Sequence, residues 1–348
     1  MFSLLRPYIF GLDPEVAHDL AIKSLKFNVI PKSFFQVEGE EILETELFKK
    51  KLKNPIGLAA GFDKSAEVYN SLFKLGFGFV EVGTITPRGQ TGNLKPRIFR
   101  LEKDRAMINR LGFNNDGMEV VSERLIESPP KDFLGINIGP NKDTKDKTSD
   151  FTKCFDKLNK LASYITVNIS SPNTEGLRDF HEEKLLSDLL NNLNKIKKNK
   201  KIHCPIVLKI SPDIEEKEIF KINELISKFK IDGVILANTT NQNREDLTDA
   251  KKNETGGLSG PPLQKISLKL IKNFYKSNKG KVPIIGVGGV DSGQSAFEKI
   301  TAGATAIQLY TGMVYNGPGI VKNIKTELIQ ILKKEKIKNI QEAVGINS

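Results

Sequence analysis

Eight short runs of apolar residues, separated by segments with helical periodicity, constrain the fold of this chain most strongly. They recur between about Pro55 and Gly312, and several are apolar throughout, as expected of strands that are covered on both faces. The runs are Ile56–Phe62, Gly78–Ile85, Leu134–Gly139, Ile165–Ser170, Ile206–Ile210, Gly233–Thr239, Ile284–Gly289 and Ala306–Thr311. Strands that alternate with helices in this way predict an α/β fold, a closed (β/α)8 TIM barrel, with an open doubly wound sheet as the alternative.

The composition is that of a globular protein, with 39% apolar and 27% charged residues in 348. The net charge of +11 comes from lysines dispersed along helical faces, without an aromatic-interleaved basic motif. We therefore expect no nucleic-acid partner, whereas attraction to an anionic membrane surface is compatible with this charge. Cys154 and Cys204 lack the spacing of metal ligands, which predicts a reduced cytosolic setting and no metal. No apolar run is long enough to cross a bilayer, and no signal or targeting peptide is evident.

The first 45 residues precede the barrel pattern and predict a small helical module, followed by a barrel domain over residues 46–340. Asp13 and Pro14 form a helix start, since an N-cap Asp precedes Pro at the first helical position. One face of this helix carries Ala17, Leu20, Ala21, Ser24 and Leu25. The preceding residues 2–10 are unusually apolar and aromatic. The module is therefore either a helix pair that packs on the barrel or an amphipathic element that enters a membrane surface.

Polar groups terminate the predicted strands, where a parallel barrel places its chemistry. After the first strand, Ala60 and Gly61 leave room for a planar ligand, and Lys64 offers a positive charge for a reduced flavin or a substrate carboxylate. A single Asn or Thr at a strand end commonly caps the next helix. Several together predict a hydrogen-bonding rim around a pyrimidine-like ring. These residues are Thr84, Asn137, Asn168, Lys209, Asn238, Thr239 and Thr240.

Glycine-rich loops after the last strands predict a phosphate site. Residues 256–260 follow strand six, residues 286–289 end strand seven, and residues 310–312 end strand eight. Backbone N–H groups in such loops form the usual phosphate cradle of a barrel. No G-x-G-x-x-G opens a βαβ unit, so the phosphate is assigned to a mononucleotide such as FMN in preference to NAD.

Two further segments carry candidate chemistry. Residues 167–174 pass from a strand into a polar, Pro-broken turn that presents Asn168, Ser171 and Asn173. Residues 109–115 place asparagines around a Gly-Phe turn, which could hold a planar, amide-rich substrate or form a plain surface loop.

These motifs resemble those of the dihydroorotate dehydrogenases, specifically the class 2, quinone-reducing, membrane-associated type. The resemblance covers nearly the whole chain, and its most specific strings are Asn-Ile-Ser-Ser-Pro-Asn-Thr from Asn168 and Asn-Arg-Leu-Gly-Phe-Asn-Asn from Asn109. It implies oxidation of (S)-dihydroorotate to orotate in de novo pyrimidine biosynthesis, with FMN as hydride acceptor and a membrane quinone as final electron acceptor. It also implies a peripheral location on the cytoplasmic side of the cell membrane.

The resemblance also implies residue roles. Ser171 corresponds to the class 2 catalytic base, where class 1 enzymes use a cysteine. His18, Arg100 and Tyr310 correspond to the quinone tunnel. The implied FMN residues are Ala60, Gly61, Lys64, Thr84, Asn137, Asn168, Lys209, Ala237, Gly260, Gly289, Tyr310 and Thr311. The implied dihydroorotate residues are Lys64, Asn109, Arg110, Leu111, Gly112, Phe113, Asn168, Asn173, Asn238 and Thr239.

Two residues depart from the family pattern. Pro140 replaces an expected lysine, which predicts an altered surface contact. Ala237 replaces a threonine, which removes a side-chain bond to the flavin but leaves room for a backbone contact. No histidine lies in a strand-end motif, so the proton taken by Ser171 is expected to leave through water, aided by Thr174 or nearby amides.

Other functions fit the pattern less well. A class 1 enzyme or a dihydropyrimidine dehydrogenase domain is disfavoured by Ser171 and the N-terminal extension. A lyase or isomerase that binds its substrate's phosphate in the cradle predicts a colourless protein. A pure membrane-binding scaffold has no use for so many polar strand ends.

Overall fold

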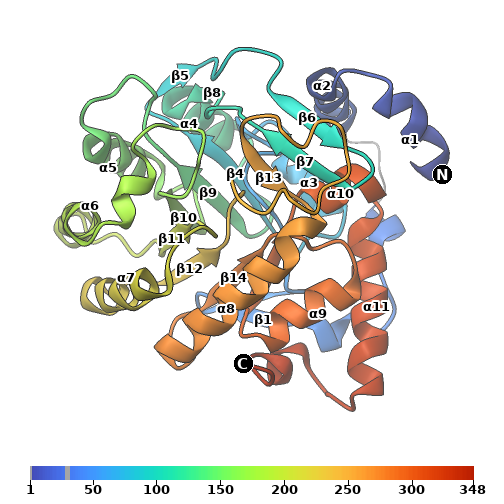
Figure 1. The fold of residues 1–348 in the computed structure, drawn as a ribbon. Helices are drawn as coiled ribbons and strands as arrows, with labels where there is room; N and C mark the ends of the chain where they lie inside the picture. The colour runs from blue at the N-terminus through green and yellow to red at the C-terminus, as the bar shows by residue number, and fades with distance from the viewer. Residues whose placement is uncertain (1, 28–31) are drawn as a thin grey trace.

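The computed structural model describes residues 2–27 and 32–348, and its centre is a closed barrel of eight parallel strands (Figure 1). Each strand pairs with the next along the chain, and the last pairs with the first, so the predicted (β/α)8 barrel is confirmed and the open sheet is wrong. The strands end one to three residues before most predicted ends, because the polar tips turn into loops. They are β3 (Ile56–Leu58), β4 (Phe79–Ile85), β9 (Leu134–Ile138), β10 (Tyr164–Asn168), β11 (Ile206–Ile210), β12 (Gly233–Leu236), β14 (Ile284–Val287) and β15 (Ala306–Leu309).

Helices surround this barrel and cover the outer faces of its strands (Figure 1). Their apolar stripes form one continuous core with the strands, which is why the strands read as apolar throughout. The helices are α3 (Tyr69–Lys74), α4 (Met118–Glu127), α5 (Lys147–Leu158), α6 (Glu183–Asn199), α7 (Glu216–Phe229), α8 (Gln264–Asn278), α9 (Gly293–Thr301), α10 (Thr311–Asn316) and α11 (Ile320–Lys334). Short 3-10 helices are η1 (Lys32–Phe35), η2 (Glu40–Leu43), η3 (Arg178–His181), η4 (Pro261–Leu263) and η5 (Ile340–Ala343).

Antiparallel strands lie outside the barrel and were not predicted from the sequence. A three-stranded sheet has the order β13 (Gly257–Ser259), β7 (Ala106–Asn109), β6 (Ile98–Leu101), and a second pair joins β5 (Arg88–Gln90) to β8 (Asn115–Gly117). The sheet brings the loop after β12 against the loop after β4, two segments far apart in sequence. It forms one wall of the site described below.

A hairpin of β1 (Thr45–Leu47) and β2 (Lys50–Leu52) contributes Leu47 and Leu52 to a second apolar cluster at the opposite end of the barrel. The same cluster holds the rings of Phe79 and Tyr164 inside the barrel. A Cβ at Gly57 would stand 2.3 Å from the Phe79 ring, which explains the glycine in an otherwise apolar strand.

The N-terminal helices α1 (Phe2–Phe10) and α2 (Pro14–Lys26) lie outside the barrel next to β6 and α10 (Figure 1). The predicted helix start is confirmed, because Asp13 Oδ1 accepts hydrogen bonds from the backbone of Glu15 and Val16. Only part of the predicted apolar face of α2 is covered: Ala21 packs on the core, whereas Leu20 is 47% exposed. Part of the predicted module, residues 1 and 28–31, lies outside the described residues. No helix in the described chain is long and apolar enough to cross a membrane.

Candidate active site

A deep cavity opens at the carboxyl ends of the barrel strands, under the β6–β7–β13 sheet. The empty space within it, including the open solvent at its mouth, is about 1250 Å³. Of the predicted residues, the cavity is lined by Ala60, Gly61, Lys64, Thr84, Asn109, Leu111, Gly112, Phe113, Asn168, Ser171, Asn173, Lys209, Ala237, Asn238, Thr239, Gly260, Gly289, Tyr310 and Thr311.

The floor of the cavity is polar and internally hydrogen-bonded. Thr84 Oγ1 accepts a hydrogen bond from Asn168 Nδ2 at 3.0 Å. Lys209 is 5% exposed and lines the cavity, and its ammonium forms no hydrogen bond or ion pair with any described residue. Burial lowers the pKa of Lys209, and the charge of Glu81 opposes that shift. A buried cation without a protein partner is suited to an anionic or carbonyl-rich ligand.

Lys64 lies where α2 meets the cavity. Its Nζ is 3.2 Å from His18 Nε2. Burial lowers the pKa of Lys64 to about 8, against the charges of Glu15, Asp19 and Asp63. Burial, followed by the charge of Lys64, lowers the pKa of His18 to about 3, so His18 is a neutral imidazole at pH 7. Lys64 is therefore the cation at this end of the cavity, and His18 is a neutral partner for it.

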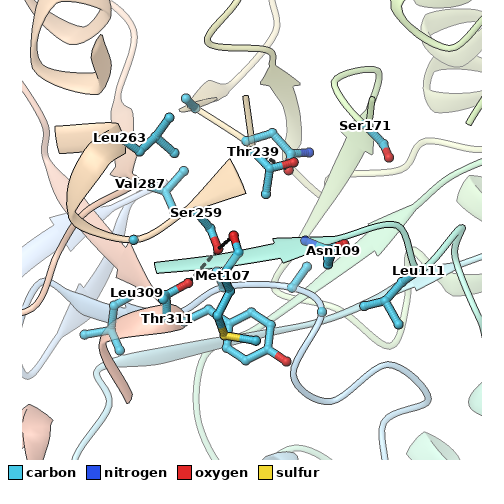
Figure 2. Close-up of a pocket in the computed structure, with 18 of the residues that line it drawn as sticks. Met107, Asn109, Leu111, Ser171, Thr239, Ser259, Leu263, Val287, Leu309 and Thr311 are labelled. Atoms are coloured by element: carbon cyan, nitrogen blue, oxygen red, sulfur yellow. Dashed lines mark hydrogen bonds between the residues drawn. The ribbon is translucent and has the colours of Figure 1, made fainter. Parts of the chain in front are cut away.

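Ser171 stands on the wall of the cavity, just beyond the end of β10 (Figure 2). The side chain is 6% exposed, and its Oγ accepts a hydrogen bond from the backbone N–H of Asn173 at 3.2 Å. No imidazole or carboxylate of the described residues hydrogen-bonds to this hydroxyl. Asn173 reaches across to Asn109, whose backbone oxygen accepts from Nδ2 at 3.1 Å. The two predicted substrate segments therefore meet at Ser171.

The hydroxyls of Ser259 and Thr311 lie together near the centre of the view in Figure 2, apart from Ser171, and glycine turns also line the cavity. Thr311 Oγ1 donates to Ser259 Oγ at 2.8 Å. Gly260 and Gly289 have φ of 104° and 78°, and a Cβ on Gly289 would stand 2.9 Å from Gln264 backbone, so neither turn admits a side chain. Thr311 also begins α10, although this helix is too short to form an anion site alone. These turns leave backbone N–H groups accessible to a phosphate.

Thr240 of the predicted rim does not line the cavity, and its hydroxyl donates to Asp213 Oδ1 instead. Four residues with roles implied by the resemblance do not line it either. Asn137 is fully buried beneath it, where its Oδ1 accepts from Thr84 Oγ1 at 2.6 Å. The Arg110 side chain points away from the cavity. Its Nη1 forms an ion pair with Glu254 Oε2 at 2.9 Å, and its guanidinium stacks on the Phe99 ring. Arg100 is held by the backbone oxygens of Phe10 and Leu12, at 3.0 Å each.

His18, the fourth, packs edge-on against Phe62, with ring centroids 5.1 Å apart. The Phe62 ring also packs edge-on against the ring of Tyr310, with centroids 5.9 Å apart, and Tyr310 lines the cavity. His18 also lines a neighbouring surface groove, which shares Lys64 with the cavity. Of the three predicted tunnel residues, His18 lies on α2 and Arg100 binds the backbone where α1 ends, while Tyr310 is linked to His18 through the ring of Phe62.

Sequence reasoning missed two residues of the apolar wall of the cavity, Ile98 and Met107. With the predicted Leu111 they lie on or next to the β6–β7 hairpin, and a small cluster joins them to Phe10 and Tyr315. Two short, mostly apolar runs at residues 98–101 and 106–109, separated by four charged residues, could have indicated a hairpin. Only the tertiary structure shows that these side chains face the cavity and the N-terminal helices.

The two residues that depart from the family pattern, Pro140 and Ala237, lie in different surroundings. Pro140 is buried, so the expected change in a surface contact is wrong. Its neighbour Asn141 explains this, because Nδ2 donates inward to the Arg88 backbone and Gln90 Oε1. Ala237 lines the cavity, where its methyl group offers no hydrogen bond. Within residues 2–27 and 32–348, no three His, Cys, Asp or Glu side chains gather where they could hold a metal ion.

A family model described as dihydroorotate dehydrogenase matches residues 42–332. A dihydroorotate dehydrogenase (quinone) from Christiangramia forsetii is 47% identical over 94% of this chain and 98% of the relative. The mitochondrial dihydroorotate dehydrogenase (quinone) of Mus musculus is 43% identical over 97% of this chain and 87% of the relative. A crystal structure of DHODH from Eimeria tenella in complex with ferulenol superposes with a TM-score of 0.92, at 37% identity over 97% of this chain and 98% of that one.

Proposed function

This chain belongs to the dihydroorotate dehydrogenase family, and we propose that it oxidises (S)-dihydroorotate to orotate with a quinone as final electron acceptor. The family resemblance seen in the motifs is confirmed, and the match to quinone-dependent relatives identifies class 2. The reaction is a step of pyrimidine biosynthesis. One observation carries the proposal in the structure: Ser171, Lys64 and the Gly289 turn line the same cavity.

Family membership implies a flavin, and we propose FMN. The cavity suits this group, because the Gly260 and Gly289 turns could receive its phosphate, and Lys209, which lines the same cavity, could donate to its ring system. When bound, FMN would accept hydride from the substrate and return the electrons to the quinone. The predicted holders that line the cavity are Ala60, Gly61, Lys64, Thr84, Asn168, Lys209, Ala237, Gly260, Gly289, Tyr310 and Thr311. Asn137 would act from beneath, through Thr84.

Ser171 is the proposed base for the C5 proton of dihydroorotate, while hydride leaves C6. The Asn173 N–H holds its Oγ in place, and the hydroxyl passes its own proton to water because no described side chain takes it. Lys64 would hold the substrate carboxylate, with amide groups of Asn109, Asn173 and Asn238 on the ring. Thr239, Leu111, Gly112 and Phe113 would complete that pocket, whereas Arg110 would act only by holding the loop at Glu254. Positioned donors of this kind stabilise the enolate-like charge that develops on proton removal.

We assign the quinone to the apolar wall of Ile98, Met107 and Leu111, beside His18, Arg100 and Tyr310. Residues 1–45 would form the module that brings this wall to the cytoplasmic side of the membrane. On α1, Leu4 and Tyr8 are 76% and 80% exposed, which supports contact with a lipid surface. Leu43 is fully buried, so the end of this module is packed against the barrel.

The visible spectrum of the purified protein tests this function. We expect a yellow protein that bleaches when dihydroorotate is added without an acceptor. Ser171→Ala should keep its flavin and slow the bleaching by about 10²–10⁴-fold, the usual contribution of a positioned base. Ser211→Ala is a matched control, since Ser211 also follows a strand and accepts from the backbone N–H two residues on, yet does not line the cavity.

Two results would count against the assignment. A colourless protein would favour a non-redox barrel that binds a phosphorylated substrate. Bleaching of Ser171→Ala at the wild-type rate in stopped-flow absorbance would remove Ser171 from the role of base.

A further inference from the structure

Glu81 on β4 is a fully buried carboxylate inside the barrel, below the cavity and outside its lining. Its Oε1 accepts from Asn137 Nδ2 at 2.8 Å. Its Oε2 accepts from Tyr164 Oη at 2.9 Å, Gln308 Nε2 at 3.0 Å and Thr166 Oγ1 at 3.1 Å. Four donors converge on two oxygens, which is the arrangement of an ionised carboxylate that only accepts.

A chain of side-chain hydrogen bonds runs from this carboxylate up to the cavity. Asn137 donates to Glu81 with its nitrogen, so its oxygen faces Thr84 and accepts from Thr84 Oγ1 at 2.6 Å. Because the Thr84 hydroxyl hydrogen is used in this bond, its oxygen can only accept from other groups, and it accepts from Asn168 Nδ2 at 3.0 Å. Thr84 therefore presents an acceptor to Asn168 Nδ2, and from the other side the backbone N–H of Ser170 donates to Asn168 Oδ1 at 3.2 Å, so both ends of this amide are oriented.

The hydrogen bonds along the cavity wall keep the same order of donors and acceptors. Asn168 Oδ1 accepts from Ser170 Oγ at 2.9 Å, and Ser170 Oγ accepts from Asn238 Nδ2 at 2.8 Å. The Asn238 oxygen is itself occupied by the backbone N–H of Thr239, at 2.8 Å. Both lining amides thus have their oxygens engaged by protein donors. Each retains a second N–H that the protein does not use, and this is what the cavity can offer a ligand.

We propose that Glu81 is a positioning residue that, together with the backbone N–H groups of Ser170 and Thr239, fixes the direction of this chain, so that Asn168 and Asn238 present N–H donors to the ligand. A carboxylate cannot donate, and as the terminal acceptor it excludes the reversed chain, in which amide oxygens would face the cavity. A donor-rich wall complements the carbonyl and carboxylate oxygens of orotate. The inference rests on the proposed function, and Glu81 touches no ligand itself.

The test compares Glu81→Gln with Glu81→Asp in the flavin-loaded protein. Glutamine keeps the shape of the side chain but adds a donor, so the chain can reverse; aspartate shortens the side chain but still only accepts. We expect orotate to bind at least tenfold more weakly to Glu81→Gln and within about threefold of wild type to Glu81→Asp. Binding is measured as the change in flavin absorbance on titration with orotate, alongside flavin content and the urea midpoint.

Thr166→Val is the matched control, because it removes one donor to Glu81 from the same buried layer without interrupting the chain. It should bind orotate within about twofold of wild type. Wild-type affinity in Glu81→Gln would overturn the inference, as would weaker binding by Glu81→Asp than by Glu81→Gln, which is the order that packing alone predicts. If Glu81→Gln does not retain flavin, the inference is still overturned when Glu81→Asp binds orotate tenfold more weakly than wild type. Failure of the wild-type protein to bind orotate would instead refute the proposed function.

Discussion

Lys299 on α9 is a fully buried lysine whose pH dependence can be worked out from its surroundings. Its Nζ donates to Ser267 Oγ at 3.0 Å, and the Ser267 hydroxyl donates to the Val287 backbone oxygen at 2.6 Å. No carboxylate of the described residues forms an ion pair with it. Burial lowers the pKa of Lys299 from 10.5 to about 7, and the charge of Glu298 only partly opposes this.

The sign of the effect on stability follows from the two pKa values. The unfolded chain keeps this proton up to about pH 10.5 and the folded chain only up to about pH 7, so unfolding takes up a proton between these limits. Within this window the free energy of unfolding rises with pH, by at most about 1.4 kcal/mol per pH unit from this group. Below pH 7 the full penalty applies, on the order of 5 kcal/mol.

Lys299→Met should therefore stabilise the protein. At pH 7.5 we expect a gain of roughly 2–4 kcal/mol, because methionine fills a similar volume without a charge but loses the hydrogen bond to Ser267. The gain should shrink by about 2 kcal/mol between pH 7.5 and 9.5 as the wild-type lysine loses its penalty. The assay is urea unfolding followed by far-UV circular dichroism at several pH values.

The control is Lys269→Met on α8, an exposed lysine whose removal should change neither the stability nor its slope with pH. Equal stability of wild type and Lys299→Met at pH 7.5, or parallel pH profiles from 7.5 to 9.5, would refute the reasoning. Either result would mean that the ammonium is solvated or paired in the folded protein.

Two other predictions concern the barrel core and the N-terminal helices. Gly57→Ala should lower the free energy of unfolding by about 1–3 kcal/mol or more, because its Cβ would press on the Phe79 ring, whereas Gly319→Ala enters open space and should be neutral in the same urea assay. Leu4→Glu combined with Tyr8→Glu should abolish flotation with anionic phospholipid vesicles and slow reduction of a long-chain quinone, yet leave bleaching by dihydroorotate unchanged. Ile126→Glu, on exposed α4 surface, should alter none of these, and vesicle binding by the α1 variant at the wild-type level would exclude α1 as the membrane contact.

Local patterns predicted the barrel well, because each strand is covered on both faces and so carries its own apolar signature. All eight predicted strands are present in the predicted order. The helix start at Asp13 and Pro14 was equally local, since a cap depends on residues two and three positions away. The strand-end rule then placed Lys64, Ser171 and Asn238 around one opening, because parallel strands bring their carboxyl ends together.

The sequence did not distinguish residues that face the cavity from residues that support it. Asn137 and Asn168 both end strands, yet Asn137 lies buried beneath Thr84 while Asn168 lines the cavity. Arg110 sits between cavity-lining neighbours and points outward to Glu254. Strand register and loop path determine these differences, and both depend on partners remote in sequence.

The amino-acid sequence by itself determined the strand order, the polar tips and the family, since these follow from short-range periodicity and contiguous motifs. Only the tertiary structure decided that a β6–β7–β13 sheet forms the apolar wall and that Glu81 terminates a hydrogen-bond chain. Both features join segments from different strands and loops, and the direction of a hydrogen-bond chain is fixed only when every donor has found its acceptor.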